Sequence, residues 1–129
     1  MEYRVCRNNP APYNDLNGKI SLLGLGTMRL PLRDAADQTS IDEEKAQEIF
    51  DYAYAHGVNY FDTAYPYHGG MSEKFCGKAL AKYPRASYHL ASKLPGWLLK
   101  CDEDVPRIFN EQLANCRTDY FDFYLAHSV

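Results

Sequence analysis

The sequence has no dense cluster of lysine and arginine, and it has no apolar run near the roughly 18 residues that a membrane-spanning helix needs. Its formal net charge of -3 also disfavours a partner held through a phosphate backbone. Residues 1–5 lack the continuous apolar core of a secretory signal. These absences predict a cytoplasmic protein with no nucleic-acid partner and no membrane partner.

The sequence also lacks any C-x-x-C pair, although it contains four cysteines: Cys6, Cys76, Cys101 and Cys116. A thioredoxin-like motif and a local zinc site are therefore unsupported. Neither an H-x-x-x-H pattern nor carboxylates at ligand spacing indicate a metal. We expect no bound metal and four reduced cysteines, with Cys76 and Cys116 on the apolar faces of predicted helices.

Strand patterns alternate with helix patterns along most of the chain. The expected strands are residues 2–6, 19–22, 22–27, 58–61, 88–93 and 120–126, and the expected helices are residues 42–56, 73–83 and 104–116. The first two strands form a hairpin with a long, turn-rich loop. The later strands, joined through helices, are parallel, which is typical of a doubly wound sheet or a closed barrel.

Three residues mark the expected ends of the first two helices. Gly57 supplies a left-handed stop after the first helix, and Pro84 ends the second. Ser72 is expected to be the N-cap of the second helix. In the third helix, one stripe is formed by Ile108, Phe109, Gln112, Leu113 and Cys116.

Ionisable side chains stand at the carboxyl ends of three successive predicted parallel strands: Asp62, Lys93 and His127. Tyr67 follows in a glycine-rich loop. Ligands of parallel α/β folds bind at this end of the strands. Carbonyl reduction needs a proton donor, and the phenol of Tyr67 could serve if the ammonium of Lys93 stabilised its phenolate. Asp62 would hold Lys93 charged, and His127 would orient the substrate oxygen.

Plainer interpretations exist for each of these residues. Asp62 could cap a turn, and Lys93 could be a solvated lysine at a strand end. Tyr65 competes with Tyr67 for the role of proton donor. His68 either lines the substrate mouth or is structural.

Five segments together resemble the aldo-keto reductases: residues 24–31, 57–67, 72–80, 92–94 and 118–127. The resemblance covers about residue 20 to the end, in the family's order and spacing. It implies a (β/α)8 TIM barrel that reduces small aldehydes or ketones with NADP(H) or NAD(H). It also implies catalytic roles for Asp62, Tyr67, Lys93 and His127, and cofactor contacts from Gly26, Thr27, Met28 and Asp62.

The residues of these motifs are most similar to those of bacterial and archaeal members, which often carry a ferredoxin-like segment after the barrel. Such a segment would bring an iron–sulfur cluster only in a longer parent protein. Neither the substrate nor the choice between NADP and NAD is defined by these residues.

A complete barrel of this kind needs about 250 residues. We therefore expect residues 1–22 to form an N-terminal hairpin that closes the barrel bottom, and residues 20–129 to form the N-terminal half of the barrel. Such a half-barrel should be inactive alone because most cofactor contacts come from the later strands. The alternative is a non-catalytic half-barrel or binding module that pairs with a partner, or with itself, through open sheet edges.

Overall fold

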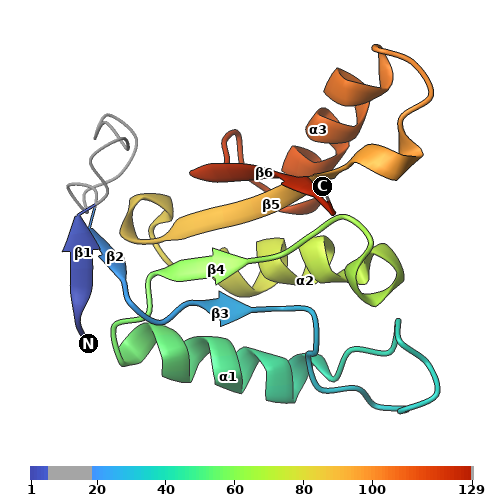
Figure 1. The fold of residues 1–129 in the computed structure, drawn as a ribbon. Coiled ribbons are helices and arrows are strands. Elements are labelled where there is room, and N and C mark those ends of the chain that lie inside the picture. Colours follow the sequence, from blue (N-terminus) through green and yellow to red (C-terminus); the bar gives the residue numbers. More distant parts are fainter. Residues whose placement is uncertain (6–18, 129) are drawn as a thin grey trace.

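A computed structural model describes residues 1–5 and 19–128 of the chain. Its centre is a four-stranded parallel sheet in the order β3-β4-β5-β6. The strands are β3 (Leu25–Gly26), β4 (Tyr60–Asp62), β5 (His89–Pro95) and β6 (Phe123–His127). In Figure 1, α1 runs alongside β3 and α2 passes behind β4. The predicted alternation of parallel strands and helices is confirmed.

The helices are α1 (Glu43–Ala55), α2 (Met71–Leu80) and α3 (Asp104–Asn115), with short 3-10 helices η1 (Tyr67–Gly70), η2 (Arg85–Ser87) and η3 (Gly96–Leu98). All three predicted helices are present, with shifted ends. None of them, within the part of the chain that the structure describes, is long and apolar enough to cross a membrane.

The prediction that Ser72 caps α2 is wrong. The N-cap residue is Gly70, whose φ of 88° lies in the left-handed region that glycine adopts without strain. The helix can therefore begin directly after η1, two residues earlier than the sequence pattern suggests. Ser72 is fully buried inside the first turn, where its hydroxyl meets the ends of two strands.

Aromatic rings form the centre of the core between the helices and the sheet. Phe50 of α1 stacks on Phe61 of β4 with ring centroids 5.4 Å apart, and it meets Phe75 of α2 edge-on at 5.5 Å. Cys76 and Cys116 are buried in the same core as free thiols, as expected. Burial raises the pKa of the Cys76 thiol to about 12, so this thiol is inert. Cys101 is exposed, and Cys6 lies outside the described residues.

The predicted hairpin is confirmed as an antiparallel pair of β1 (Tyr3–Val5) and β2 (Lys19–Ser21). It lies at the amino ends of the parallel strands (Figure 1). The side chain of Asn59, just before β4, accepts a hydrogen bond from the Ser21 amide at 2.8 Å and donates one to the Lys19 carbonyl at 3.1 Å. The hairpin therefore leaves the carboxyl end of the sheet open.

Strands β3 and β6 each pair on one side only, so the sheet described by residues 19–128 is an open part of a barrel. The long β5–β6 pairing matches Ser92 with Tyr124 and Pro95 with His127. Because side chains alternate across a strand, Ser92 and Tyr124 share one face of the sheet while Lys93 and His127 share the other.

Candidate active site

An ion pair organises the carboxyl end of the sheet. The Nζ atom of Lys93 lies 2.5 Å from Asp62 Oδ1 and donates a second hydrogen bond to the Thr63 carbonyl at 2.7 Å. The Lys93 side chain is only 14% exposed, and Asp62 is 28% exposed. A buried ammonium is costly unless it is paired and hydrogen-bonded, and both conditions are met here.

The ring of Tyr67 covers this ion pair. Lys93 Nζ lies 4.9 Å from the ring centroid, within range of a cation–π interaction. Tyr67 begins η1, where its backbone amide donates to the Ala64 carbonyl at 3.2 Å. The tight turn after β4 therefore brings the tyrosine back over the lysine of the neighbouring strand.

His127 completes the group of four. Its ring meets that of Tyr67 edge-on with centroids 5.8 Å apart. Its buried Nδ1 atom is without a hydrogen-bond partner among the described residues. Burial lowers the pKa of His127, the charge of Lys93 lowers it further, and Asp62 opposes the shift. The imidazole is therefore neutral at pH 7, with one nitrogen able to donate and the other able to accept.

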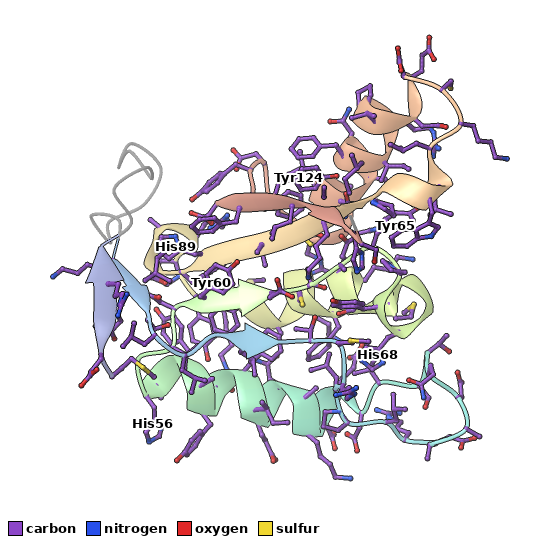
Figure 2. All side chains as sticks on the ribbon, in the orientation of Figure 1. His56, Tyr60, Tyr65, His68, His89 and Tyr124 are labelled. Atoms are coloured by element: carbon purple, nitrogen blue, oxygen red, sulfur yellow. The ribbon has the colours of Figure 1, made fainter. Side chains whose placement is uncertain are left out.

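The other tyrosine candidate points elsewhere. The hydroxyl of Tyr65 donates to Glu111 of α3 at 3.1 Å. Burial and this carboxylate raise the pKa of the Tyr65 phenol, which weakens it as an acid. Figure 2 shows Tyr65 on the side of the sheet end towards α3. Of the two, Tyr67 is the tyrosine that contacts Lys93.

The histidine next to Tyr67 is structural. His68 is buried, its Nε2 accepts a hydrogen bond from the Leu30 amide at 3.1 Å, and its Nδ1 lies 2.9 Å from the Gln38 carbonyl. Both nitrogens are therefore used within the protein, and the alternative that His68 lines the substrate mouth is wrong. Figure 2 shows it between the site and the loop before α1.

The residues predicted to touch a cofactor lie at the end of β3, beside Asp62. Thr27 is fully buried, and its hydroxyl donates to the Asp62 carbonyl at 3.0 Å and lies 2.8 Å from the Ser72 hydroxyl. The Thr27 amide also donates to the Asp62 carbonyl, at 2.9 Å, so Thr27 holds the ends of β3 and β4 together and presents no exposed surface. Met28 is exposed, and a Cβ at Gly26 would meet nothing within 4 Å, so this strand end is open. The open surface at this strand end therefore comes from Gly26 and Met28, with Thr27 buried behind them.

Three residues near the site were missed by the sequence analysis. Trp97, in η3, lies 5.0 Å from the His127 ring and is 53% exposed. The sequence feature that could have indicated Trp97 is its position directly after Pro95 and Gly96, at the end of a predicted strand. Glu73 and Gln112 are fully buried behind Lys93, and the signal for them was the polar Gln112 within an apolar stripe.

No group of three or more histidine, cysteine, aspartate or glutamate side chains is placed to hold a metal ion within residues 1–5 and 19–128. The model of the aldo/keto reductase family matches residues 22–129. The chain belongs to this family. Its predicted membership and its (β/α)8-barrel fold class are thereby confirmed, with the described residues forming an open part of the barrel.

Several members of the family are similar to this chain. L-galactose dehydrogenase of Arabidopsis thaliana is 32% identical over 117 residues, which cover 86% of this chain and 35% of that protein. The holo form of an aldo-keto reductase from Bacillus halodurans has a TM-score of 0.73 at 30% identity, covering 97% of this chain and 40% of that one. An aldo-keto reductase from Klebsiella pneumoniae in complex with NADPH has a TM-score of 0.71 at 26% identity, covering 98% and 40%.

The chain spans about a third of the length of the curated relatives it matches, from 34% to 36% of the first three. Family membership supports an oxidoreductase.

Proposed function

We propose that the full-length protein reduces aldehydes or ketones to alcohols with NAD(P)H, using Asp62, Tyr67, Lys93 and His127. The observation that carries this proposal is the Lys93 ammonium, which is held by Asp62 and the Thr63 carbonyl directly beneath the Tyr67 ring. Such a lysine can stabilise the phenolate that remains when a tyrosine gives up its proton.

Each of the four side chains has a distinct part. Tyr67 delivers its phenolic proton to the carbonyl oxygen as negative charge develops there, and Lys93 stabilises the resulting phenolate. Asp62 fixes the position of Lys93. The neutral His127 donates a hydrogen bond to the same substrate oxygen and orients it.

The nicotinamide end of the cofactor would rest on the end of β3, against Gly26 and Met28, with Asp62 alongside and the buried Thr27 supporting this strand end from within. When bound, the reduced nicotinamide supplies the hydride that reaches the carbonyl carbon. NADPH in the similar Klebsiella pneumoniae enzyme supports a nicotinamide cofactor. The exposed Trp97 would form an apolar wall for the substrate beside His127.

The decisive experiment compares Tyr67→Phe with Tyr65→Phe in the full-length protein. Both variants lose one hydroxyl, but only Tyr67 covers Lys93, while the Tyr65 hydroxyl binds Glu111. We expect Tyr67→Phe to lower kcat for carbonyl reduction by about 10²- to 10⁴-fold with cofactor affinity nearly unchanged. Tyr65→Phe should stay within a few-fold of wild type. A Tyr67→Phe variant that retains normal turnover contradicts the assignment.

A second candidate function rests on the open edges of β3 and β6. Unpaired strand edges are templates for pairing, so residues 1–129 could act as a non-catalytic module that self-associates. Light scattering on the purified chain tests this: a dimer supports pairing, whereas a monomer that binds NADPH tightly contradicts it. The hairpin bonded to the amino ends would in either case close the barrel bottom.

A further inference from the structure

The first turn of α2, the helix that follows Tyr67, contains two polar residues, Ser72 and Glu73, that are both fully buried. The proposed chemistry uses neither of them. The Ser72 hydroxyl lies 2.8 Å from that of Thr27, after β3, and 3.0 Å from that of Thr63, after β4. The first turn of α2 thus joins the ends of two strands that border the site.

The carboxylate of Glu73 reaches strand β5 and helix α3. Its Oε1 accepts hydrogen bonds from the Ser92 hydroxyl at 2.7 Å and from Gln112 Nε2 at 2.6 Å. Its Oε2 accepts one from Asn115 Nδ2 at 3.2 Å. Among the described residues, all three partners of this carboxylate are neutral donors, so hydrogen bonds stand here in place of a cation. A buried carboxylate is costly, and hydrogen bonds from neutral donors offset that cost less than a paired cation would.

Gln112 carries the network onward to the strands that bear the site. Its Nε2 also donates to the Lys93 carbonyl at 3.0 Å, and its Oε1 accepts from the Tyr124 hydroxyl at 2.6 Å. Figure 2 shows Tyr124 on β6, on the side towards α3. Burial first, and then the charge of Glu73, raise the pKa of Tyr124 to about 12, so its hydroxyl remains a donor.

The network therefore contacts β5 and β6 on the face of the sheet opposite to Lys93 and His127. Ser92 and Tyr124 are cross-strand partners on the face towards the helices, while Lys93 and His127 project from the opposite face. Any shift of β5 against β6 would alter the distance between Lys93 and His127. Both strands end in the site, and Gln112 contacts both of them.

We propose that Glu73 is a positioning residue, which through Gln112 and Ser92 fixes Lys93 and His127 relative to each other. The expected effect of Glu73 on catalysis rests on the proposed function. Its expected effect on the relative position of Lys93 and His127 rests on the contacts alone. This role explains why a charged side chain occupies a core position between α2, α3 and β5.

The acceptor pattern makes the proposal testable with a swap. Glu73 offers acceptors on both sides, to Ser92 and Gln112 on one and to Asn115 on the other. In Glu73→Gln, the new amide must face one of these donors with its own N–H groups. Adding Asn115→Asp supplies an acceptor on the Oε2 side. The double variant therefore restores a complementary pair, with the negative charge on residue 115 in place of residue 73.

In the full-length protein, we expect Glu73→Gln to lower kcat by about 10- to 100-fold, because small misplacements of catalytic groups cost this much. KM and cofactor affinity should change by less than a few-fold. Glu73→Gln with Asn115→Asp should recover most of the loss. The matched control is Glu44→Gln, the same change at an exposed position of α1, which should leave kcat unchanged.

A second measurement, independent of turnover, separates this inference from the proposed function. The pH titration of the His127 ring can be followed by NMR in the full-length protein, with His127→Gln identifying its signal among those of the other histidines. Burial and Lys93 hold the pKa of His127 below its ordinary value, with Asp62 opposing them. Loosening β5 against β6 should raise this midpoint in Glu73→Gln, and the double variant should return it to the wild-type position.

If wild-type protein has no carbonyl reductase activity, the proposed function fails while the His127 midpoint still decides the positioning role. A Glu73→Gln variant with normal kcat and an unchanged midpoint overturns the inference. A loss that Asn115→Asp does not reverse also overturns it. Should Glu73→Gln not fold, Tyr124→Phe removes the contact to Gln112 from the β6 side, and it must then shift the His127 midpoint in the same direction.

Discussion

The two ends of the parallel sheet use buried polar side chains in opposite ways. At the amino end, Asn59 and His89 bind the hairpin, and Asp122 accepts hydrogen bonds from Arg85 at 2.7 Å and from the Leu90 amide at 2.8 Å. At the carboxyl end, His127 keeps a buried nitrogen without a partner among the described residues. Figure 2 shows His89 at the hairpin end, far along the sheet from Tyr65.

This difference indicates which end is built for stability and which for chemistry. Polar atoms that satisfy one another inside the protein stabilise the fold and leave nothing for a ligand. The Asp122 side chain is 1% exposed, whereas Asp62 is 28% exposed beside Lys93. Variants at the two ends should therefore separate activity from stability.

The largest expected effect is on activity at the carboxyl end. Lys93→Met removes the ammonium beneath Tyr67 while keeping a similar apolar stem. We expect kcat in the full-length protein to fall by about 10³-fold, because the phenolate left by proton transfer loses its stabilising charge. Asp62 is partly solvated and tolerates the loss, so urea denaturation should show little change in the free energy of unfolding. A large loss of stability would contradict the contrast between the two ends.

The second prediction concerns cofactor binding by a polypeptide of residues 1–129. Only Gly26, Met28 and Asp62 are proposed to contact the nicotinamide end, with Thr27 buried behind them, and family resemblance assigns most remaining contacts to later strands. The dissociation constant for NADPH should therefore be about millimolar or weaker, and turnover negligible. Calorimetric titration of the purified chain measures it. A micromolar constant would mean that the site is completed in another way, with self-association as the first cause to examine.

The third prediction concerns the amino end of the sheet, where a substitution should lower stability. Asp122→Ala leaves Arg85 and the Leu90 amide without their shared acceptor, and breaking such a buried pair costs about 3–5 kcal/mol. The free energy of unfolding, measured with urea, should fall by about the lower figure because Arg85 is partly exposed. Asp119→Ala, at a nearby exposed position, is the matched control and should be nearly neutral. An equal loss of unfolding free energy in both variants would contradict the role of Asp122 as a stabilising buried acceptor.

Much of the fold could be predicted because it depends on local patterns. The periodicity of Ala46, Phe50 and their neighbours, with Gly57 as a stop, identified α1 within one residue at each end. Asp62, Lys93 and His127 could be placed together because parallel strands end at the same edge of a sheet. Their catalytic roles remain a prediction.

What the sequence could not provide depends on contacts between distant segments. Glu73 meets Gln112 across 39 residues, so neither residue alone indicates a buried network. Tyr65 is distinguished from Tyr67 by Glu111, 46 residues further along the chain. Ser72 was misassigned because a serine before an apolar run is typical of an N-cap, whereas here the left-handed Gly70 starts the helix.

The fourth prediction tests the packing behind the site. A Cβ at Gly77 of α2 would lie 2.6 Å from the Cys116 carbonyl carbon and 2.7 Å from the Asn115 carbonyl oxygen. Gly77→Ala should therefore cost about 1–3 kcal/mol of unfolding free energy, despite the better helix propensity of alanine. Gly96→Ala, where a Cβ meets nothing within 4 Å, is the control. A stabilised Gly77→Ala variant would show that α2 and α3 are not packed this closely.

The smallest effect is a difference in how the two ends respond to acid. The pKa of His127 is lowered in the folded state by burial and by Lys93, so its contribution to stability is present above the ordinary histidine pKa of about 6.5 and is lost as pH falls through the folded value. Burial alone would raise the pKa of Asp122, but hydrogen bonds from His89 and Leu90 and the charge of Arg85 outweigh it and lower that pKa.

The stability that Asp122 contributes is therefore fully present above the ordinary aspartate pKa, near 3.9, and disappears only as pH falls through its lower folded value. Urea denaturation of the full chain across pH 7 to 3 should show a small early loss that His127→Gln abolishes. It should also show a later loss, beginning below about pH 4, that His127→Gln leaves intact and Asp122→Asn reduces. If His127→Gln changes only the later loss, the carboxyl end does not hold a partly buried imidazole with a lowered pKa, and the contrast between the two ends of the sheet fails.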